Sequence, residues 1–432
     1  MRRIIRWFTP VRIIALGFFA VILIGSVLLS LPFCVREGIE LPYIDALYMS
    51  TSAVCVTGLS TVDAGSTFTP IGQFILGFLM QIGGLGVTVI GAGAILLIGK
   101  KIDLKGRNAV REAMNLGAGR SAIRFVRGVF IMTVIIELLG AIASFFVFVK
   151  DFPLPRAIGL SLFHSVAAFN NSGFDILGNS NSLAAYESNV ALNLITVVLI
   201  ILGGIGFLVM REIISKGFRW RKLSMHTKIV LTVSLALIVV GTLLSKLTEN
   251  ISWLTAFFTS VSTRTAGFAT FSMGELSNAG VLVVIVLMVI GASPGSTGGG
   301  IKTSTFFVLL CGLVASATNR SEKAFHYSIP KNAFRKACVI LLLAFSIVGI
   351  SSFALCIIEP ELNMRDVLFE MSSAMGTVGL STGITSVLSD WSKLISMLVM
   401  YIGRLGPLTV ASLWYFSDVE RIRYPEGNIA IG

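Results

Sequence analysis

The stretch "YMSTSAVCVTGLS" at residues 48–60 begins with an aromatic residue, continues through small and hydroxyl-bearing residues, and ends around a glycine followed by leucine. Three other stretches follow the same pattern: "FHSVAAFNNSGFD" (163–175), "FFTSVSTRTAGFA" (257–269) and "FEMSSAMGTVGLS" (369–381). Self-similarity of this kind has to be recognised before any single motif is interpreted. The chain therefore contains four copies of one sequence pattern, and this repeated unit decides the fold.

The four stretches align without gaps on one glycine each. An aromatic residue stands ten positions before that glycine and a large apolar residue one position after it in every copy. A second glycine follows 24 to 30 residues later, always after isoleucine or leucine: Ile82-Gly83, Leu202-Gly203, Ile290-Gly291 and Ile402-Gly403. A single glycine would indicate no more than a turn. Four in register make chance a poor explanation.

The composition places these repeats in a membrane. Of the 432 residues, 55% are hydrophobic and only 13% are charged, whereas soluble domains carry about a quarter charged residues. Continuous apolar runs exclude an outer-membrane barrel, whose strands alternate. Eight runs are candidate spans: 13–31, 74–98, 129–149, 190–210, 229–244 (short, so that its ends recruit Thr227 and neighbouring polar residues), 281–317 (interrupted), 339–358 and 394–415.

Each repeat is thus a span, a short amphipathic segment, a glycine segment and a second span. The short segments cannot cross a bilayer and are typical of re-entrant half-helices. We predict an all-α integral membrane protein with eight full spans, in four tandem membrane helix–pore loop–membrane helix repeats around one pseudo-fourfold pore. The repeats cover residues 1–105, 106–220, 221–320 (with a broken second helix) and 321–432 (with the C-terminal tail).

Charge predicts the orientation. The N-terminus, three alternate loops and the C-terminal tail together hold 25 Lys and Arg against 7 acids, and the other loops hold 7 against 14. The basic side is cytoplasmic by the positive-inside rule, so both termini are expected inside. The net charge of +12 then reflects topology. No aromatic-basic pattern accompanies it, so nucleic-acid binding is not expected. The basic loops are candidates for contact with anionic membrane lipid or with a cytosolic partner.

The glycine segments are candidates for an ion filter. Half-helices around one axis direct their partially negative C-terminal ends at a common point, and rings of backbone carbonyls replace the hydration shell of a cation. Glycine allows the backbone angles that such a segment requires. We predict that cations are coordinated by backbone carbonyls of Val56, Thr57, Gly58, Asn171, Ser172, Gly173, Thr265, Ala266, Gly267, Thr377, Val378 and Gly379.

A second glycine-rich stretch, "GASPGSTGGGIKTST" (291–305), interrupts the second span of the third repeat. It resembles a nucleotide-binding P-loop, but Lys302 comes one position too late after Gly300, and a P-loop follows a strand in a soluble unit. Pro294 and the glycines are expected to break the helix. The corresponding spans of repeats 1 and 2 are expected to be more continuous. We predict a gate below the filter made by Pro294, Gly295, Ser296, Thr297, Gly298, Gly299, Gly300, Lys302 and Arg404.

Charged residues within the repeats need partners. Arg404 lies inside the last span, where a charge is a functional hypothesis by default, and is expected to bond to loop carbonyls of residues 296–300. Lys302 is expected to face the cytoplasmic vestibule. Arg264 would repel a cation in the filter, so it is expected to turn aside with Asn170 and Asn171, toward Glu370 or Asp366. Glu137 is interpreted as a satisfied structural acid.

The sequence resembles the membrane subunit of the Trk/Ktr/HKT superfamily of potassium transporters, most closely its Ktr branch. The resemblance runs from Val11 to about Arg423 and is most specific in "VCVTGLSTVD", "NNSGFD", "STRTAGF", "GTVGLSTGIT" and "SPGSTGGGIKT". It implies potassium as the transported ion, since some plant relatives that favour sodium have serine where this chain has Gly58. It also implies an intramembrane gating loop that faces an arginine.

The resemblance further implies a homodimer in the bacterial plasma membrane, in contact with a cytosolic RCK-type regulatory ring that binds ATP or ADP. Nucleotide would then bind only to that partner, and sodium would be an activator. Whether transport is uniport or symport stays open.

Other functions remain as alternatives. An alternating-access cation symporter often has inverted repeats, unlike these, and a sodium-selective uniporter is a variant that ion competition would separate. For an intramembrane enzyme, Ser296 would be the nucleophile, but no base stands at a recognisable spacing; we do not expect an enzyme. The histidines are far apart and the cysteines form no CxxC pair, so no metal centre or disulfide is expected.

Overall fold

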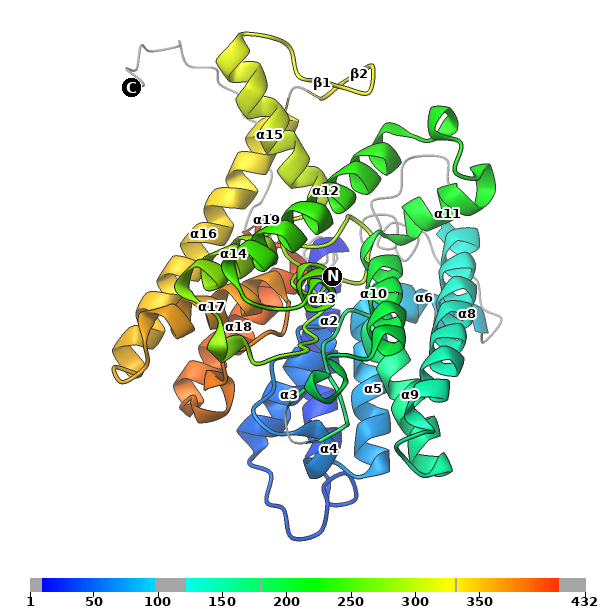
Figure 1. The fold of residues 1–432 in the computed structure, drawn as a ribbon, viewed down its shortest axis with the longest axis vertical. Coiled ribbons are helices and arrows are strands. Elements are labelled where there is room, and N and C mark those ends of the chain that lie inside the picture. Colours follow the sequence, from blue (N-terminus) through cyan, green and yellow to red (C-terminus); the bar gives the residue numbers. More distant parts are fainter. Residues whose placement is uncertain (1–9, 98–121, 179–180, 331, 412–432) are drawn as a thin grey trace, which may run out of the picture.

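The computed structural model describes residues 10–97, 122–178, 181–330 and 332–411. The predicted boundary between the first two repeats, most of the basic stretch 100–127 and both termini lie outside the described residues. Helices make up nearly all of the structured part, with one antiparallel hairpin of β1 (Lys323–Ala324) and β2 (Tyr327–Ser328) (Figure 1). The all-helical class predicted from the sequence therefore holds for this part of the chain.

Four helices in the described part are long and apolar enough to cross a membrane, or five spans if one sharply bent helix pair is counted as a span. Their outward-facing side chains are largely apolar: Ile24, Phe146, Leu235 and Ile350 are between 60% and 70% exposed, as expected for a surface that contacts lipid. The long helices are α2 (Pro10–Leu29), α8 (Ala122–Phe148), α12 (Met225–Thr248) and α16 (Ala333–Ile358).

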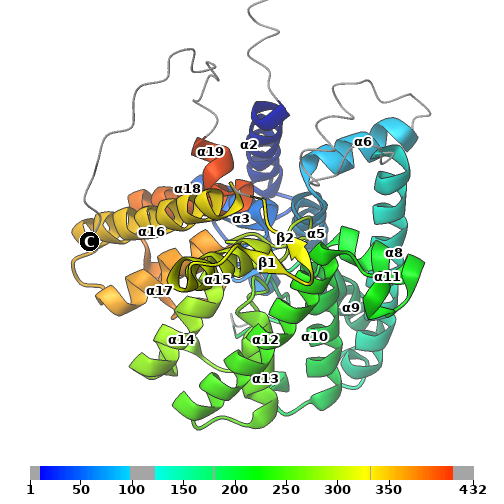
Figure 2. The ribbon, with the colours of Figure 1, turned by 90° about the horizontal axis from the view of Figure 1, so that it is seen from above.

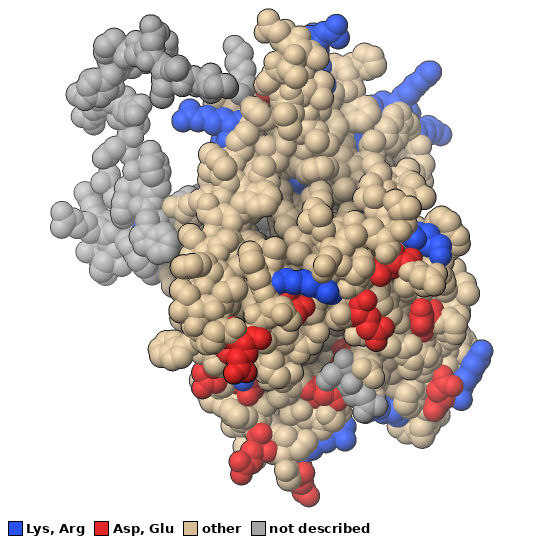
Figure 3. Space-filling view, turned by 60° about the vertical axis from the view of Figure 1, so that its left-hand side comes forward, with Lys and Arg blue, Asp and Glu red and all other residues tan. Residues whose placement is uncertain are grey.

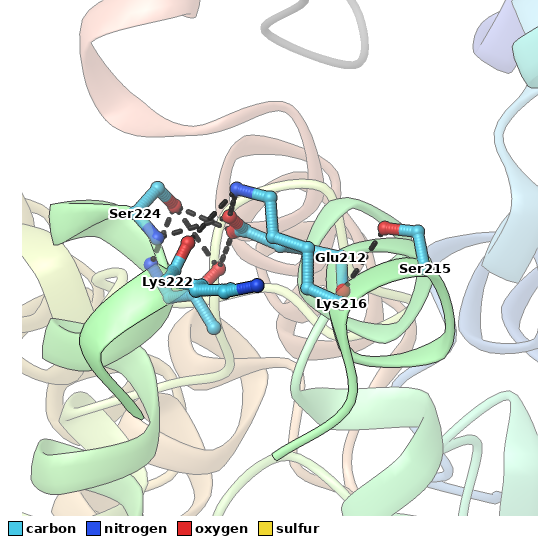
Figure 4. A network of polar contacts seen from close by, with 6 residues as sticks. Glu212, Ser215, Lys216, Lys222 and Ser224 are labelled. Carbon is cyan, nitrogen blue, oxygen red and sulfur yellow. Dashed lines mark hydrogen bonds and ion pairs between the residues drawn. The ribbon is translucent and has the colours of Figure 1, made fainter. Parts of the chain in front are cut away.

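Helix α12 is longer than its apolar core of residues 229–244. Ser224 caps its first turn by accepting a hydrogen bond from the Thr227 backbone nitrogen at 3.4 Å, which satisfies one of the free donors at a helix start. Glu212 then accepts bonds from the backbone nitrogen and Oγ of Ser224, at 2.9 and 2.6 Å, and from Lys216 Nζ at 2.6 Å (Figure 4). This network fixes the connection that leads into α12, and the prediction that polar residues extend the short span is confirmed.

Each long helix is followed by a short helix of 10 to 16 residues. These helices are too short to cross a bilayer, and each ends just before one of the four glycine segments. They are α3 (Tyr43–Cys55), α9 (Leu154–Phe169), α13 (Trp253–Ser262) and α17 (Met364–Gly376). Viewed from above, the helices follow one another around a common centre in the order of the sequence (Figure 2).

The helix after each glycine segment is interrupted, in every repeat. The four pairs are α5 (Pro70–Leu85) with α6 (Val87–Leu97), α10 (Val190–Gly204) with α11 (Phe207–Lys216), α14 (Asn278–Val289) with α15 (Thr303–Thr318), and α18 (Asp390–Leu405) with α19 (Pro407–Ala411). In the third pair a loop of residues 290–302 separates the helices.

The other three pairs break at one glycine each. Gly86, Gly206 and Gly406 have φ values of 86°, 90° and 91°, a backbone conformation that glycine adopts readily and that ends a helix. Between α10 and α11 the axes differ by 97°. The helix pairs α5–α6 and α10–α11 are thus more continuous than α14–α15, as expected, but they are not unbroken.

The first and last repeats meet through buried polar contacts. Lys393 Nζ on α18 lies 2.7 Å from Asp45 Oδ1 on α3, with both residues less than 10% exposed. One turn along α18, Ser396 Oγ lies 3.0 Å from the Tyr48 hydroxyl. Because these residues stand about 348 positions apart in the chain, the contacts close the circle of helices.

Replacing Asp45 with alanine is expected to destabilise this closure, because it leaves the Lys393 ammonium buried without its partner. Breaking a buried ion pair from one side costs about 3–5 kcal/mol, and thermal unfolding in detergent would show a lowered Tm. The double variant Asp45→Ala/Lys393→Met should be more stable than Asp45→Ala. An unchanged Tm in the single variant would mean that the pair contributes nothing to closure.

Charged side chains divide along the long axis. On the face in Figure 3, Asp and Glu gather on the lower half of the molecule, while the upper end carries mainly Lys and Arg. The division agrees with the asymmetry of the loops in the sequence.

Candidate functional site

The four glycine segments meet one another in a closed ring. A Cβ built on each glycine would run into the backbone of the next segment, so no side chain fits at any of the four positions. Such a Cβ would meet the Ser172 carbonyl oxygen at Gly58, that of Ala266 at Gly173, that of Val378 at Gly267, and that of Thr57 at Gly379. The carbonyl before each of the four glycines thus stands beside the glycine of a neighbouring segment.

The backbone of each segment has an uncommon conformation that recurs four times. The glycines have φ values between 68° and 98°, and the residue two positions before each glycine has a φ between 49° and 68°. Residues with a side chain rarely adopt a left-handed φ, and such strain gathers at functional sites. The strained residues are Val56, Asn171, Thr265 and Thr377. The sequence-predicted filter residues of all four repeats therefore come together.

Two of the segments are anchored by serines on their own short helix. Ser52 Oγ accepts a hydrogen bond from the Gly58 backbone nitrogen at 3.0 Å, and Ser373 Oγ accepts one from the Gly379 nitrogen at 3.0 Å. Both serines stand six positions before the glycine. Sequence analysis did not single them out, although their shared spacing was visible in the aligned stretches.

The second and third segments bond to their own short helices through Ser172 and Ser262, and a side chain beside each segment also reaches a surrounding helix. Asn170 Nδ2 donates to Gln81 Oε1 at 2.7 Å and to Glu137 Oε1 at 3.0 Å. Arg264 donates to the Ser234 carbonyl oxygen at 3.0 Å and to Ser234 Oγ at 3.3 Å. Asn170 and Arg264 thus point toward surrounding helices, as predicted, and Glu137 is a bonded acid of the helix bundle.

The predicted partner of Arg264 was wrong. Its guanidinium bonds to Ser234 on α12, whereas Glu370 accepts a hydrogen bond from Thr385 Oγ1 and Asp366 lies 3.4 Å from the Asn363 amide. A carbonyl and a hydroxyl oxygen, rather than an acid, accept from the terminal nitrogens of this buried cation. This acceptor was not predictable from the sequence, because any helix oxygen at the right depth can accept from an arginine.

The loop of residues 290–302 lies against one side of the ring. Gly299 N donates to Thr377 Oγ1 at 3.1 Å, and Thr297 Oγ1 donates to the Phe169 carbonyl oxygen at 3.2 Å. A Cβ on Gly298 would collide with Thr265 Oγ1. The loop therefore touches the strained residues of two segments and the end of α9, and its glycines allow that close approach.

The remainder of the loop is held by backbone bonds. Gly291 N donates to the Ile301 oxygen at 2.8 Å, closing the loop at its base, and Ser293 N donates to the Gly204 oxygen at 3.0 Å. Phe207 N donates to the Gly295 oxygen at 3.0 Å. Pro294, Gly295 and Ser296 are half-buried, and residues 297–300 are buried.

Both predicted gate cations bond to loop carbonyls. Arg404 donates to the Thr297 oxygen and, on α5, to the oxygens of Gly83 and Gly84, the last at 3.2 Å, so the predicted contact with carbonyls of residues 296–300 is present. Lys302 Nζ donates to the Gly298 oxygen at 2.7 Å and the Gly299 oxygen at 3.2 Å. Lys302 therefore folds back onto its own loop. That it faces a cytoplasmic vestibule stays a prediction.

A carboxylate stands two residues beyond the second ring glycine. Asp175 lies outside the spanning helices, and its Oδ1 accepts a hydrogen bond from Leu177 N at 3.1 Å. Burial, with a smaller contribution from the nearby charge of Asp63, raises the pKa of Asp175 to about 6 against the opposing effect of backbone hydrogen bonds. A titrating acid thus lies close to the ring.

The sites proposed for other chemistries are not assembled. Ser296 Oγ has no hydrogen-bond partner in the described part of the chain, so no base activates it there. Among the described residues no cluster of His, Cys, Asp or Glu could hold a metal ion, and the five cysteines are free.

Comparison with known proteins agrees with this architecture. The family model described as "TrkH: Cation transport protein" matches residues 11–417. The chain is 37% identical to the potassium/sodium uptake protein NtpJ of Enterococcus hirae, covering 100% of this chain and 99% of that protein. It is 36% identical to the Ktr system potassium uptake protein B of Bacillus subtilis, over 100% and 99% of the two chains.

A solved structure shows the same fold. The potassium transporter TrkH from Vibrio parahaemolyticus superposes with a TM-score of 0.72 over 92% of this chain and 84% of that one, at 19% identity. The family match over nearly the whole length, together with relatives well above 30% identity, leads to one conclusion: the chain belongs to the TrkH family of cation transport proteins.

Proposed function

We propose that this protein takes up potassium across the bacterial plasma membrane through a selectivity filter formed by the four glycine segments. The observation that carries the proposal is the closed ring, in which the carbonyl oxygens of Thr57, Ser172, Ala266 and Val378 each stand beside a neighbouring glycine. Such a ring can replace the hydration shell of a potassium ion. Two relatives at 36–37% identity are named as potassium or potassium/sodium uptake proteins, which supports the choice of ion.

The architecture proposed around the filter has eight spans in four tandem repeats, with each interrupted second helix counted as one span. The basic end of the molecule would face the cytoplasm, together with both termini. Backbone that is not helical is tolerated at membrane depth only when buried or lining a cavity. The glycine segments and the loop of residues 290–302 satisfy that condition, since both are largely buried.

The loop of residues 290–302 is proposed as the gate. It lies directly against Thr265 and Thr377 of the ring, and Arg404 connects it to α5. In this position the loop obstructs the path to the filter, and the arginine adds an electrostatic barrier to cations. Opening would require the loop to leave Thr377 and the Phe169 carbonyl.

Regulation is proposed to come from other chains. Relatives are named as parts of a Ktr system, and a homodimer bound to a cytosolic RCK-type ring that carries ATP or ADP would fit a channel-like subunit whose gate must be controlled. Sodium is proposed as an activator of this uptake.

Ion competition tests the proposed function. Rubidium uptake would be measured in a bacterium that lacks its own potassium uptake and expresses this chain, with excess unlabelled potassium or sodium as competitor. Uptake blocked by potassium supports the proposal, and block by sodium alone would overturn the selectivity. If no uptake occurs, a cytosolic nucleotide-binding subunit is co-expressed. Absence of rubidium uptake with that subunit present would contradict the potassium function.

Uptake is also expected to fall in acid. With the pKa of Asp175 raised to about 6, its carboxyl group is ionised in roughly nine-tenths of molecules at pH 7 and in roughly one-tenth at pH 5. Loss of this negative charge near the ring lowers the local cation concentration. Rubidium uptake between pH 5 and 8 should therefore drop as the pH falls through 6.

Asp175→Asn supplies the control for this pH dependence. The variant should give a lower rate at pH 7 and a flat profile across the same range. A profile that keeps its inflection in Asp175→Asn would assign the titration to another group.

A further inference from the structure

The position three residues before each ring glycine is occupied differently in each repeat. The first and fourth repeats have Cys55 and Gly376 there, and serine hydroxyls hold their glycine nitrogens. The second repeat has Asn170, whose side chain reaches two other helices. The second segment is therefore held by its own short helix, through the Ala167 oxygen, and also by groups on other helices.

Asn170 is fully buried and heavily bonded. Its Nδ2 donates to Gln81 Oε1 on α5 at 2.7 Å, to Glu137 Oε1 on α8 at 3.0 Å and to the Val166 oxygen at 2.9 Å, while its Oδ1 has no partner among the described residues. Three acceptors surround two N–H groups, so the amide cannot rotate without losing bonds. The next residue, Asn171, has the strained φ of 57°.

Glu137 is an acid near the middle of the long apolar helix α8 (Ala122–Phe148). An ionisable side chain at that depth is expensive and marks function more often than stability. Its side chain reaches inward to Asn170, and its own carbonyl oxygen accepts from Ser165 Oγ on α9 at 2.6 Å. Glu137 thus contacts the short helix both directly and through Asn170.

The same amide packs on α5, a helix that also bonds to the proposed gate. A Cβ on Gly84 would collide with Asn170 Oδ1, so the backbone of α5 packs directly on this side chain. The Gly84 oxygen also accepts from Arg404 at 3.2 Å. Asn170 therefore packs on the same residue of α5 that accepts a hydrogen bond from the gate arginine.

We propose that Glu137 is a positioning residue for ion selectivity: with Gln81 it fixes the Asn170 amide, and Asn170 fixes the backbone of Asn171 to Gly173 in the ring. The proposal rests on the potassium-filter function proposed above. A carbonyl ring selects by the spacing and number of its oxygens, so loosening one of four segments changes discrimination between ions, and not only the rate.

The test compares rubidium and sodium uptake by the full-length chain in the same uptake-deficient bacterium, with abundance in the membrane measured for each variant. Glu137→Leu removes the acceptor and is expected to lower the rubidium-to-sodium uptake ratio about tenfold, the scale of one buried hydrogen bond. Glu137→Gln keeps an acceptor oxygen for Asn170 and should stay within about twofold of the parent. Gln81→Met should shift the ratio in the same direction as Glu137→Leu.

The matched control is Thr133→Val. Thr133 is a buried residue one turn earlier on α8, and its Oγ1 has no hydrogen-bond partner in the described part of the chain. This variant should leave the ratio unchanged, since it disturbs the same helix without touching Asn170.

The outcomes separate the two proposals. If the parent chain does not prefer rubidium to sodium, the proposed potassium filter fails. If the parent is selective but Glu137→Leu and Gln81→Met only slow uptake at an unchanged ratio, the positioning role is overturned. Should Glu137→Leu not reach the membrane, Gln81→Met and Glu137→Gln decide, and a Glu137→Gln ratio as low as that of Gln81→Met would contradict the role assigned to the acceptor oxygen.

Discussion

Replacing Gly267 with serine is expected to reduce potassium uptake to background. Gly267 has a φ of 77°, and a Cβ there would collide with the Val378 carbonyl oxygen while lying 3.1 Å and 3.2 Å from the Cα atoms of Gly173 and Gly379. The left-handed backbone alone costs roughly 1–2 kcal/mol for a residue with a side chain. The collision displaces one of the four carbonyls, which lowers affinity for the dehydrated ion. Rubidium uptake at matched abundance measures the loss.

Gly38→Ser is the control for backbone strain. Gly38 has a similar φ of 81°, but a Cβ there would meet nothing within 4 Å, so the substitution imposes the conformational cost without the collision. It should leave uptake close to that of the parent chain. Normal potassium-selective uptake in Gly267→Ser would show that the ring is not the filter.

Replacing Arg404 with alanine is expected to raise uptake in the absence of any partner subunit. The guanidinium donates to the Thr297 oxygen of the loop and to the oxygens of Gly83 and Gly84 on α5, and bonds from a charged donor contribute about 1.5–3 kcal/mol each. Losing even one such bond shifts the closed-to-open equilibrium by at least about tenfold. Removing the charge also lowers the barrier to cations.

Tyr401→Phe is the matched control for Arg404→Ala. Tyr401 lies one turn earlier on α18 and donates to the Ala15 oxygen at 2.7 Å, away from the loop, so its loss should not open the gate. Rubidium efflux from preloaded proteoliposomes would compare the variants with the parent. Reduced flux in Arg404→Ala at normal abundance would contradict the gating role.

The sequence predicted the features that depend on the backbone. Gly58, Gly173, Gly267 and Gly379 stand in one register because the segments pack too closely for a side chain, and that requirement is visible as a repeated glycine. The break around Pro294 was likewise predictable, since proline and glycine cannot continue a helix. The apolar runs indicated a membrane protein. The polar residues beside the short run 229–244 indicated that its helix, α12, is longer than the run.

Features that depend on partners distant in the sequence were not predictable. Arg264 takes a backbone carbonyl of α12 as its acceptor, and nothing in a sequence marks one carbonyl among many. The breaks at Gly86 and Gly206 were missed because a single glycine inside an apolar run is also compatible with a continuous helix, and only the positive φ distinguishes the two. The acceptors of Lys302 were not predictable either, since they are carbonyl oxygens of its own loop.

The most direct test of the central claim is to locate the ion. Anomalous diffraction from crystals of the full-length protein grown in rubidium is expected to show a peak at the centre of the ring formed by the Thr57, Ser172, Ala266 and Val378 carbonyl oxygens. That peak should disappear in Gly267→Ser. Rubidium bound elsewhere in the membrane region, with none inside the ring of the parent protein, would contradict the account.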